Sequence, residues 1–351
     1  MFGPAEVPMS RKIKLILLLL PIIALSFPAS SAVKKRLEAR VETTGSGPAV
    51  LWRNPTDIGT RDLFYGPGGK EHQPHGTFTF LKEDLDGSNP KFFVRDEAGV
   101  KWKVKLGVEA RPETAASRFV WAAGYFANED YFLRDLQVEN MPAHLHRGQK
   151  LVAPDGSMHN VRLKRYPEGE KKIGNWQWRH NIFTGTRELN GLRVMMALIN
   201  NWDVKDENNA IYEEPRGRGE DPEQVYMISD LGASFGTAGP NWPLAKAKGN
   251  LESYRTSKLI RRVAQDQVDF YEPSRPSYHY LVNPHQYFAR RGLRWIGRHI
   301  SSSDARWMGE MLAQLSPRQI RDAFRAAGYS TQEVEGFARV VETRIAQLTD
   351  L

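Results

Sequence analysis

Four polar side chains in two short segments of this chain have the types that phosphoryl transfer requires. Asp203 is followed two residues later by Lys205 and five residues later by Asn208. A second segment carries Asp230 directly after an apolar run. Phosphoryl transfer needs one carboxylate for the proton of the nucleophile, an amide oxygen and a second carboxylate for Mg²⁺, and a cation that neutralises phosphate charge. The four residues are therefore candidates for one active site.

The spacing within the first segment resembles the catalytic loop of the protein-kinase-like superfamily. The second segment, Met227–Gly232, is an apolar strand that ends in Asp-Leu-Gly, which has the form of the metal-binding DFG element of the same proteins. The two segments occur in the expected order, and an apolar run over Leu189–Ile199 leads into the first.

The resemblance implies a role for each of these residues. Asp203 would accept the proton of the incoming hydroxyl, and Lys205 would stabilise the transferred phosphoryl group. The implied cofactors are ATP and Mg²⁺, or Mn²⁺. Asn208 and Asp230 would bind the metal, with Asn209 as a neighbouring alternative to Asn208.

The chain resembles an atypical, distant branch of this superfamily. Asn201-Trp202 stands where the family has His-Arg before the catalytic Asp, and a loop over 215–219 lengthens the gap between the two segments. The lipid-kinase, secretory-pathway and bacterial toxin-kinase branches tolerate such changes, and this chain is more similar to them. We expect a bacterial exported family.

The strand before the first long helix supplies a candidate phosphate-binding lysine. Alternation with period 2 places Lys101, Lys103 and Lys105 on one face of this strand. The resemblance implies that such a lysine contacts the nucleotide phosphates and pairs with a glutamate on the next helix. We assign these roles to Lys105 and Glu113, with Lys103 and Glu109 in reserve. A solvated lysine face on an edge strand would show the same pattern.

The turn at residues 86–89 stands where the kinase-like fold covers the phosphates. Backbone amides at Gly87 and Ser88 could cap phosphate oxygens there, although the turn lacks G-x-G-x-x-G and also reads as an ordinary hairpin turn. The glycines at 66–69 are not followed by Lys-Ser/Thr and a helix, so they do not form a P-loop.

Periodicity and turn residues predict the elements that must position these groups. Strands are expected over Thr77–Leu81, Lys91–Arg95 and Val100–Leu106, then a helix over Glu113–Tyr125, then a hairpin of Leu151–Ala153 and Val161–Tyr166. Later elements are expected over Leu189–Asn200 (helix), Val225–Ser229 (strand), and Leu251–Asp269, Pro284–Ile300, Arg318–Ala327 and Thr331–Leu348 (helices).

This order is that of a two-lobed α+β fold of the protein-kinase-like type. It has a small antiparallel-sheet N-lobe with one helix and a larger helical C-lobe. We divide the chain into a signal peptide at 1–32, an N-terminal extension at 33–76, the N-lobe at 77–170 and the C-lobe at 171–351.

The N-terminus has the order of a secretory signal. Arg11, Lys12 and Lys14 precede the apolar run Leu15–Phe27, and small residues lead to a cleavage point after Ala32. An uncleaved anchor is the alternative, although the run is shorter than the roughly 20 residues that cross a bilayer. With 0 Cys the chain has no disulfides, which favours a bacterial periplasmic or secreted protein.

The charge of the chain restricts its partners. The net charge of +8 is spread along the sequence, and no basic stripe interleaved with exposed aromatic residues indicates nucleic-acid binding. The expected partners are a nucleotide and an acceptor, which could be a protein, a lipid or a small molecule. Membrane contact is expected only through an uncleaved N-terminal segment. A catalytically silent binding protein and a relative that transfers AMP remain as alternative functions.

Overall fold

The computed structural model describes residue 3 and residues 47–201, 203–217, 219–237, 247–271, 279–282 and 284–351. The predicted signal peptide lies outside these residues apart from residue 3, as does the predicted extension up to residue 46. Among the described residues, no helix is both long enough and apolar enough to cross a membrane.

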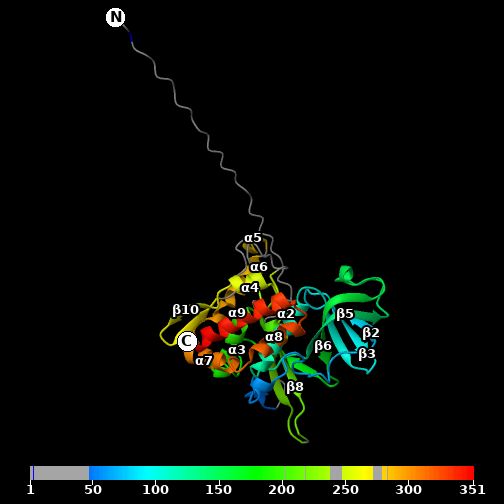
Figure 1. Cartoon of the computed structure of the whole chain (residues 1–351), viewed down its shortest axis with the longest axis horizontal. Coiled ribbons are helices and arrows are strands. Elements are labelled where there is room, and N and C mark those ends of the chain that lie inside the picture. Colours follow the sequence, from blue (N-terminus) through cyan, green and yellow to red (C-terminus); the bar gives the residue numbers. More distant parts are fainter. Residues whose placement is uncertain are drawn as a thin grey trace, which may run out of the picture. The chain divides into compact units, whose positions relative to one another are not determined.

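Five strands close into a barrel in the order β2–β3–β4–β6–β5 (Figure 1). They are β2 (Phe78–Glu83), β3 (Lys91–Asp96), β4 (Lys101–Lys105), β5 (Asp130–Glu139) and β6 (Ser157–Tyr166). Neighbouring strands are antiparallel, except that β2 and β5 close the barrel through a short parallel pairing.

Alternation along the strands separates the barrel interior from its outer face. On β4, Trp102 and Val104 are buried in the interior together with Leu163 of β6. The lysines at 101, 103 and 105 therefore point to the outer face, as the sequence predicts. This face carries the candidate phosphate-binding lysine.

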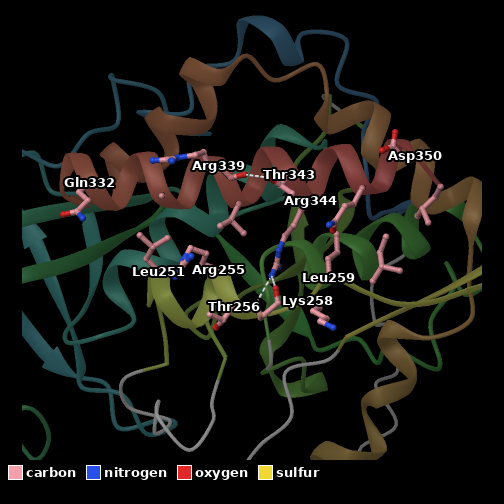
Figure 2. A pocket seen from close by; sticks show the side chains of 16 residues that line it. Leu251, Arg255, Thr256, Lys258, Leu259, Gln332, Arg339, Thr343, Arg344 and Asp350 are labelled. Atoms are coloured by element: carbon pink, nitrogen blue, oxygen red, sulfur yellow. Dashed lines mark hydrogen bonds between the residues drawn. The ribbon is translucent and has the colours of Figure 1, made fainter.

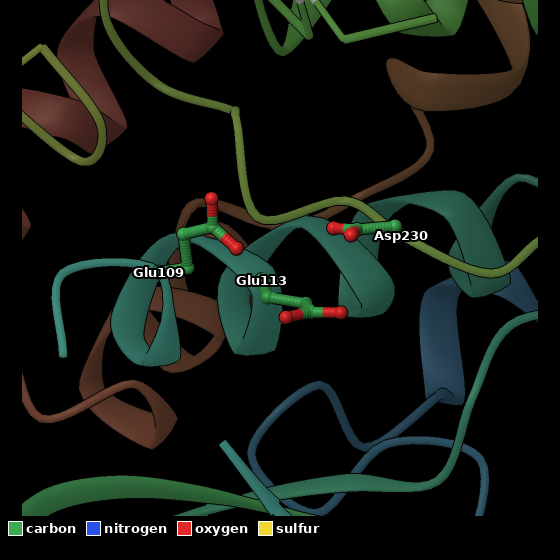
Figure 3. A group of neighbouring side chains, drawn as sticks. All are labelled: Glu109, Glu113 and Asp230. Atoms are coloured by element: carbon green, nitrogen blue, oxygen red, sulfur yellow. The ribbon is translucent and has the colours of Figure 1, made fainter. Parts of the chain in front are cut away.

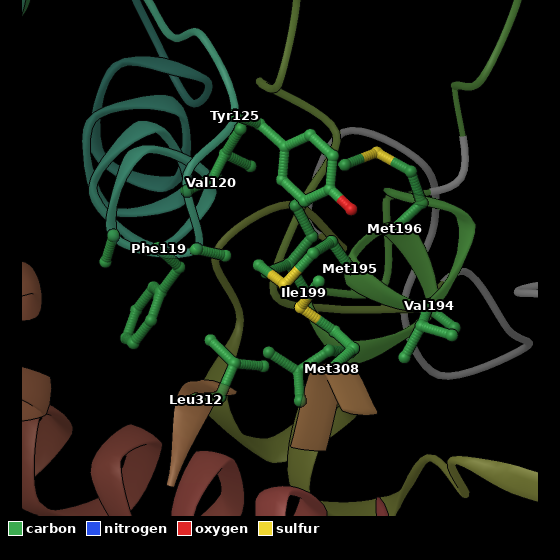
Figure 4. Close-up of a cluster of buried hydrophobic side chains, with 14 of the residues drawn as sticks. Phe119, Val120, Tyr125, Val194, Met195, Met196, Ile199, Met308 and Leu312 are labelled. Atoms are coloured by element: carbon green, nitrogen blue, oxygen red, sulfur yellow. The ribbon is translucent and has the colours of Figure 1, made fainter. Parts of the chain in front are cut away.

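Helix α2 (Ala110–Ala122) follows β4 and packs against β5 and β6. Its apolar face joins the largest core, which it shares with α3 (Arg187–Leu198) and α7 (Ser302–Leu312) (Figure 4). Phe119, Met195 and Met308 are fully buried in this core, and burying each such side chain contributes roughly 1.5–3 kcal/mol. This packing fixes α2, which carries Glu113, relative to α3, which leads into the predicted catalytic loop.

A second sheet has the strand order β1–β9–β8–β7. Its strands are β1 (Ala49–Val50), β7 (Lys171–Gly174), β8 (Asn209–Glu214) and β9 (Glu223–Ile228). β8 and β9 form an antiparallel hairpin, while β1 adds to β9 in parallel. Because Asn209 pairs with Ile228 at the open end of the hairpin, the residues before β8 lie beside the residues after β9.

The remaining elements are α4 (Leu251–Thr256), β10 (Ile260–Ala264), β11 (Gln267–Phe270), α5 (His279–Val282), α6 (Pro284–Gly292), β12 (Ile300–Ser301), α8 (Pro317–Ala326) and α9 (Thr331–Thr349). Of these, α8 and α9 contribute side chains to the largest core, as α7 does. Short 3-10 turns lie at Ile58–Thr60, Gln149–Leu151, Asp206–Asn208 and Arg294–Gly297. Helix α9 begins in the capping box that the sequence predicts, in which Ser330 and Glu333 bond to each other's backbone amides.

Three predicted elements are wrong. Residues 151–153 are not a strand that pairs with 161–166, because β6 pairs instead with β5, a strand that the sequence did not indicate. The predicted helix over 251–269 ends at Thr256 and gives way to the β10–β11 hairpin, whose turn holds Gln265 at φ 54°. The predicted helix over 284–300 ends at Gly292, and Ile300 pairs as a strand with Val268. Strand pairing within the β10–β11 hairpin and between β11 and β12 outweighs local helical periodicity here.

Candidate active site

The ammonium of Lys105 lies among three carboxylates. Its Nζ is 2.7 Å from Oε2 of Glu113, 3.2 Å from Oε2 of Glu109 and 3.3 Å from Oδ1 of Asp230. The ion pair that the sequence predicts between Lys105 and Glu113 is therefore present, and the reserve glutamate contacts the same ammonium. Lys105 and the two glutamates are buried, whereas the Asp230 side chain is 35% exposed.

Figure 3 shows Glu113 on α2, Glu109 directly before this helix, and Asp230 on the segment that passes alongside it. Oxygen atoms of the three carboxylates all lie within 4.8 Å of one another, which is a donor set that a hard cation accepts. Because the Lys105 ammonium contacts all three, this cluster is an ammonium site rather than a candidate metal site.

Arg162 is a member of this network that the sequence did not reveal. It contacts Oε1 of Glu113 at 2.9 Å and Oδ1 of Asp130 at 3.1 Å, and all three side chains are buried. Arg162 lies opposite Lys105 in the pairing of β6 with β4. Alternation around Val161 would have placed Arg162 on the outer face, but the register that brings it beside Lys105 is not visible in the sequence.

The network sets the protonation of its members. Burial acts to raise the pKa of Asp230, but Lys105, the backbone amide of Gly232 and Arg162 lower this pKa to about 2. Burial also opposes the charge of Lys105, yet Asp230 and Glu113 raise its pKa well above the usual value. Burial raises the pKa of Glu113 against the opposing effect of Arg162 and Lys105. Asp230 is thus anionic and Lys105 cationic at neutral pH.

The predicted catalytic loop begins where α3 ends. The Thr186 hydroxyl caps the start of α3 by accepting a hydrogen bond from the Leu189 amide at 3.2 Å. Asn200 ends the helix at φ 56°, a left-handed conformation that asparagine tolerates. Its side chain donates to the Ser257 hydroxyl at 2.9 Å, which ties the start of the loop to the segment after α4.

A pocket of about 1000 Å³ lies between α4 and α9 (Figure 2). None of the predicted site residues lines this pocket. Arg344 reaches from α9 and donates to the Leu198 carbonyl at 2.7 Å and to the Ser257 hydroxyl at 2.7 Å. It thereby satisfies a carbonyl at the C-terminus of α3, where a cation is also favoured by the helix dipole.

Within the loop the predicted residues contact one another. Oδ1 of Asp203 lies 3.2 Å from Nζ of Lys205. The Asn208 side-chain amide donates to the backbone carbonyl of Asp203 at 2.6 Å. These contacts fold the loop back on itself, so that its carboxylate, ammonium and amide are grouped together.

Backbone contacts join this loop to the Asp-Leu-Gly segment. The amide and hydroxyl of Ser229 donate to the Asn208 carbonyl at 2.8 and 3.0 Å, and the Asn128 side chain donates to the Ser229 carbonyl at 3.1 Å. Asn208 therefore lies beside the residue that precedes Asp230. The side chain of the alternative ligand Asn209 is buried and donates a hydrogen bond to the Trp176 carbonyl at 3.0 Å, not to a residue of the predicted site.

Two oxygen atoms here are suited to a divalent cation. Oδ1 of Asp230 receives Lys105 and the Gly232 amide, while its Oδ2 has no hydrogen-bond partner among the described residues. The Asn208 side chain uses its nitrogen for Asp203, which turns its oxygen away from that bond. Carboxylate and amide oxygens are hard donors that Mg²⁺ and Mn²⁺ accept, so these residues fit the metal that the resemblance implies.

The β2–β3 turn reaches the network through one residue. Gly87 and Ser88 are exposed, and the Gly87 carbonyl accepts a hydrogen bond from Arg147. The Asn89 side chain donates to Oε2 of Glu109. The turn is thus attached to the first turn of α2, but no contact places Gly87 or Ser88 against the other predicted residues.

Glu109 connects this turn to the segment that follows Asp230. Lys248 forms an ion pair with Oε1 of Glu109. A Cβ atom on Gly232 would lie 2.7 Å from Oε2 and 2.9 Å from Cβ of Glu109. The glycine of the Asp-Leu-Gly element is therefore required by its close approach to α2.

Comparison with known proteins gives distant similarities only. No family model matches the chain, and no curated protein matches it significantly. Among solved structures, a Helicobacter pylori proinflammatory kinase, CtkA, is 11% identical with a TM-score of 0.43, covering 79% of this chain and 96% of its own. The Golgi casein kinase is 10% identical with a TM-score of 0.34, covering 79% of this chain and 73% of its own. Both TM-scores are below 0.5.

Proposed function

We propose that this chain is an ATP- and Mg²⁺-dependent phosphotransferase of two-lobed, kinase-like architecture, acting on an acceptor hydroxyl. In this proposal the barrel and α2 form the smaller lobe, and α3, the β8–β9 hairpin and the later helices form the larger one. One observation carries it: the Lys105 ammonium joins Glu113 of α2 to Asp230 of the Asp-Leu-Gly segment. Kinase-type phosphoryl transfer requires that the lysine–glutamate ion pair and the metal-binding aspartate are both in place.

In this function Lys105 would bind phosphate oxygens of the nucleotide. Glu113 holds Lys105 in place, while Asp230 is the partner from which the ammonium can be drawn toward phosphate. Asp230 and Asn208 would hold Mg²⁺, which supplies positive charge to the phosphate oxygens when it is bound. Because Lys105 and Arg162 keep Asp230 ionised, its carboxylate is ready to bind metal throughout the neutral pH range.

Asp203 would receive the proton of the acceptor. The acceptor oxygen attacks the terminal phosphorus, the bond from that phosphorus to the bridging oxygen breaks, and ADP leaves with the electron pair. The hydroxyl proton passes to the Asp203 carboxylate. Lys205, 3.2 Å from Asp203, would neutralise charge on the transferred group.

The contact between Asp203 and Lys205 favours transfer over silent binding. Nucleotide binding alone requires Lys105, Asp230 and Asn208, whereas Asp203 and Lys205 serve the acceptor and the group that moves. AMP transfer uses the same residues on a different phosphorus atom and is distinguished by its product.

The test uses the full chain and calorimetry with ATP in the presence of Mg²⁺ or of a chelator. We expect binding that depends on the metal and that falls at least tenfold in Asp230→Asn. Asp203→Asn should retain binding while phosphoryl transfer from labelled ATP falls by about 10²–10⁴-fold. Asp266→Asn, in the β10–β11 turn, is the control with the same charge change and should match the wild type.

The mass added to the protein or to an acceptor mixture separates a phosphoryl product from an adenylyl product. ATP affinity that is unchanged in Asp230→Asn would show that the metal site is wrongly assigned. A folded wild type that binds ATP and Mg²⁺ but transfers nothing to any acceptor class would support the silent binding protein.

A further inference from the structure

The outer face of the barrel beside Lys105 is unusually basic. β4 is flanked by β3 and β6 in a register that aligns three rows of three residues across the strands. Seven of the nine side chains in these rows are basic. The nine are Lys91, Lys105 and Arg162 in the first row, Phe93, Lys103 and Lys164 in the second, and Arg95, Lys101 and Tyr166 in the third. We call this set the lysine face.

Two of the three basic residues in the first row are neutralised within the candidate site, whereas the third, Lys91, shares its carboxylate with the second row. Lys105 and Arg162 have carboxylate partners in the site described above. In the second row Lys103 lies 2.9 Å from Asp84, which also receives Lys91 at 3.6 Å. The ammonium groups of Lys91 and Lys103 thus share the single carboxylate of Asp84 next to the candidate active site.

Lys164 has no ion pair with a carboxylate among the described residues, although it is 6% exposed. Its one hydrogen bond there is a long one, 3.4 Å, to the Tyr212 hydroxyl of β8. Burial opposes the charge of Lys164, but Tyr212, Tyr166 and Glu170 raise its pKa above the usual value, so the ammonium stays charged. With no carboxylate at ion-pair distance among the described residues, this ammonium is able to bind an anionic ligand.

The crowding of ammonium groups is also visible in their protonation. Burial, Lys103 and Lys105 lower the pKa of Lys91 against the opposing effect of Asp84. Burial, with Lys164 and Lys103, likewise lowers the pKa of Lys172. Neighbouring ammonium groups repel one another, and a bound anion would reduce this repulsion.

The aromatic rings of the lysine face are already covered by cations. Nζ of Lys101 and of Lys103 lie 4.5 and 4.9 Å from the ring centre of Phe93. Nζ of Lys164 lies 4.8 Å from the ring centre of Tyr166. Ammonium groups bind the faces of these rings, so the rings are not free to stack on a nucleobase.

We propose that the lysine face binds a chain of linked phosphates that enters at Lys105 and continues past Lys103 and Lys164. The ligand class is an extended polyphosphate, either inorganic or carried on a nucleoside. From Lys105 to Lys101 the face covers two strand repeats, about 13 Å, and a phosphate chain presents negative charge along all of this length. The inference rests on the proposed function only in taking Lys105 as a phosphate-binding residue.

Calorimetry on the full chain tests this with inorganic tripolyphosphate, long-chain inorganic polyphosphate, a nucleoside tetraphosphate and ATP. We expect long-chain polyphosphate to bind more tightly than ATP, to displace ATP, and to lose affinity steeply with added salt. Tighter binding of the nucleoside tetraphosphate than of the inorganic chains would identify a nucleotide as the source of the phosphate chain.

Two variants separate a ligand-binding role from a structural one. Lys103→Gln and Lys164→Met should each weaken polyphosphate binding at least tenfold. Lys258→Gln, at the exposed edge of the pocket between α4 and α9, removes the same charge and should change the affinity for polyphosphate less than twofold. Lys164→Met should still melt in one cooperative transition, because an apolar side chain of similar length replaces an ammonium whose hydrogen bond to Tyr212 is 3.4 Å long.

A wild type without measurable affinity for any polyphosphate overturns the inference, and so does unaltered binding in Lys164→Met. Tighter binding of a single-stranded oligonucleotide than of polyphosphate would show that the lysine face binds nucleic acid instead. ATP and Mg²⁺ binding without polyphosphate binding refutes this inference and leaves the proposed function intact. Polyphosphate binding that needs Lys164 but occurs without any phosphoryl transfer refutes the proposed function and leaves this inference intact.

Discussion

The side-chain amide of Asn208 donates a 2.6 Å hydrogen bond to the backbone carbonyl of Asp203. One residue thereby performs two tasks, because its nitrogen fixes the backbone that carries the proposed base and its oxygen is left for the metal. Ser229 donates two hydrogen bonds to the Asn208 carbonyl, so the same residue also sets the position of the loop relative to Asp230.

Replacing Asn208 should therefore affect both metal use and turnover. Asn208→Ala removes the metal oxygen and releases the Asp203 backbone, so we expect a higher Mg²⁺ concentration for half-maximal rate and a turnover at least about tenfold lower. Steady-state rates over a Mg²⁺ titration measure both effects. Asp203→Asn serves as the comparison, since it should lower turnover without changing the Mg²⁺ requirement. An unchanged Mg²⁺ requirement in Asn208→Ala would remove Asn208 from the metal site.

Glu113 should contribute to stability as well as to nucleotide binding. Glu113→Gln leaves Lys105 and Arg162 with fewer charged partners, and we expect the free energy of unfolding to fall by about 2 kcal/mol. Urea denaturation measures this change. Glu310→Gln, an exposed change on α7, is the control and should have almost no effect. A loss in Glu113→Gln no larger than in the control would show that the buried network does not stabilise the fold.

The stability of the site should depend on pH in a way that Asp230 controls. The pKa of Asp230 is lowered to about 2 in the folded chain, below the usual value of about 3.9. The ionised Asp230 contributes its full stabilisation at any pH above its pKa in the unfolded chain. This contribution is lost as the pH falls from about 4 toward about 2. Urea midpoints across this range should fall less steeply for Asp230→Asn than for the wild type. Parallel curves would count against the ion pair with Lys105.

Gly232 should tolerate no side chain. The Cβ atom of Gly232→Ala would overlap the side chain of Glu109, and the required shift should cost about 1–3 kcal/mol and weaken nucleotide binding. Thermal melting and calorimetry measure these effects. Gly217→Ala is the matched control, because its Cβ would meet only the flexible end of Glu220. Wild-type melting and binding in Gly232→Ala would disprove the close approach.

The N-terminal segment should be removed on export. We propose that the chain is periplasmic or secreted and that its mature form begins near Val33, because the basic, apolar and small residues before it follow the order of a signal peptide. Intact mass spectrometry of the protein from a cell-envelope fraction measures the mature N-terminus. A full-length chain recovered from the cytosol would contradict this proposal, and a full-length chain in the membrane would identify an anchor.

The local parts of the site could be predicted from the sequence. Alternation on one strand was sufficient to place Lys105 on one face of β4, and the resemblance to the kinase-like superfamily implied its pairing with Glu113 of the next helix. The order of the loop around Asp203 and the segment around Asp230 predicted two neighbouring segments, and the β8–β9 hairpin brings them together. In each case the decisive information lies within a few residues.

The parts that depend on distant pairing could not be predicted. Arg162 joins the site only through the register of β6 against β4, and β5 lacks a clear alternating pattern. The β10–β11 hairpin was mistaken for a helix because its strands pair with each other and with β12. The sequence placed the three lysines of β4 on one face, but the complete lysine face was missed, because the residues of β6 join it only through the register of that distant strand against β4.

The pairing of β1 with β9 limits how early the second sheet can form during synthesis of the chain. The Gln224 side chain donates a hydrogen bond to the Gly47 carbonyl across 177 residues, so the strand that leads to Asp230 gains its edge partner from a segment near the N-terminal end of the described residues. At about 5–20 residues per second, a ribosome makes the second partner about 9–35 seconds after the first. During that interval the early segment has no strand to join, so the second sheet acquires its β1 edge only after most of the chain has been synthesised.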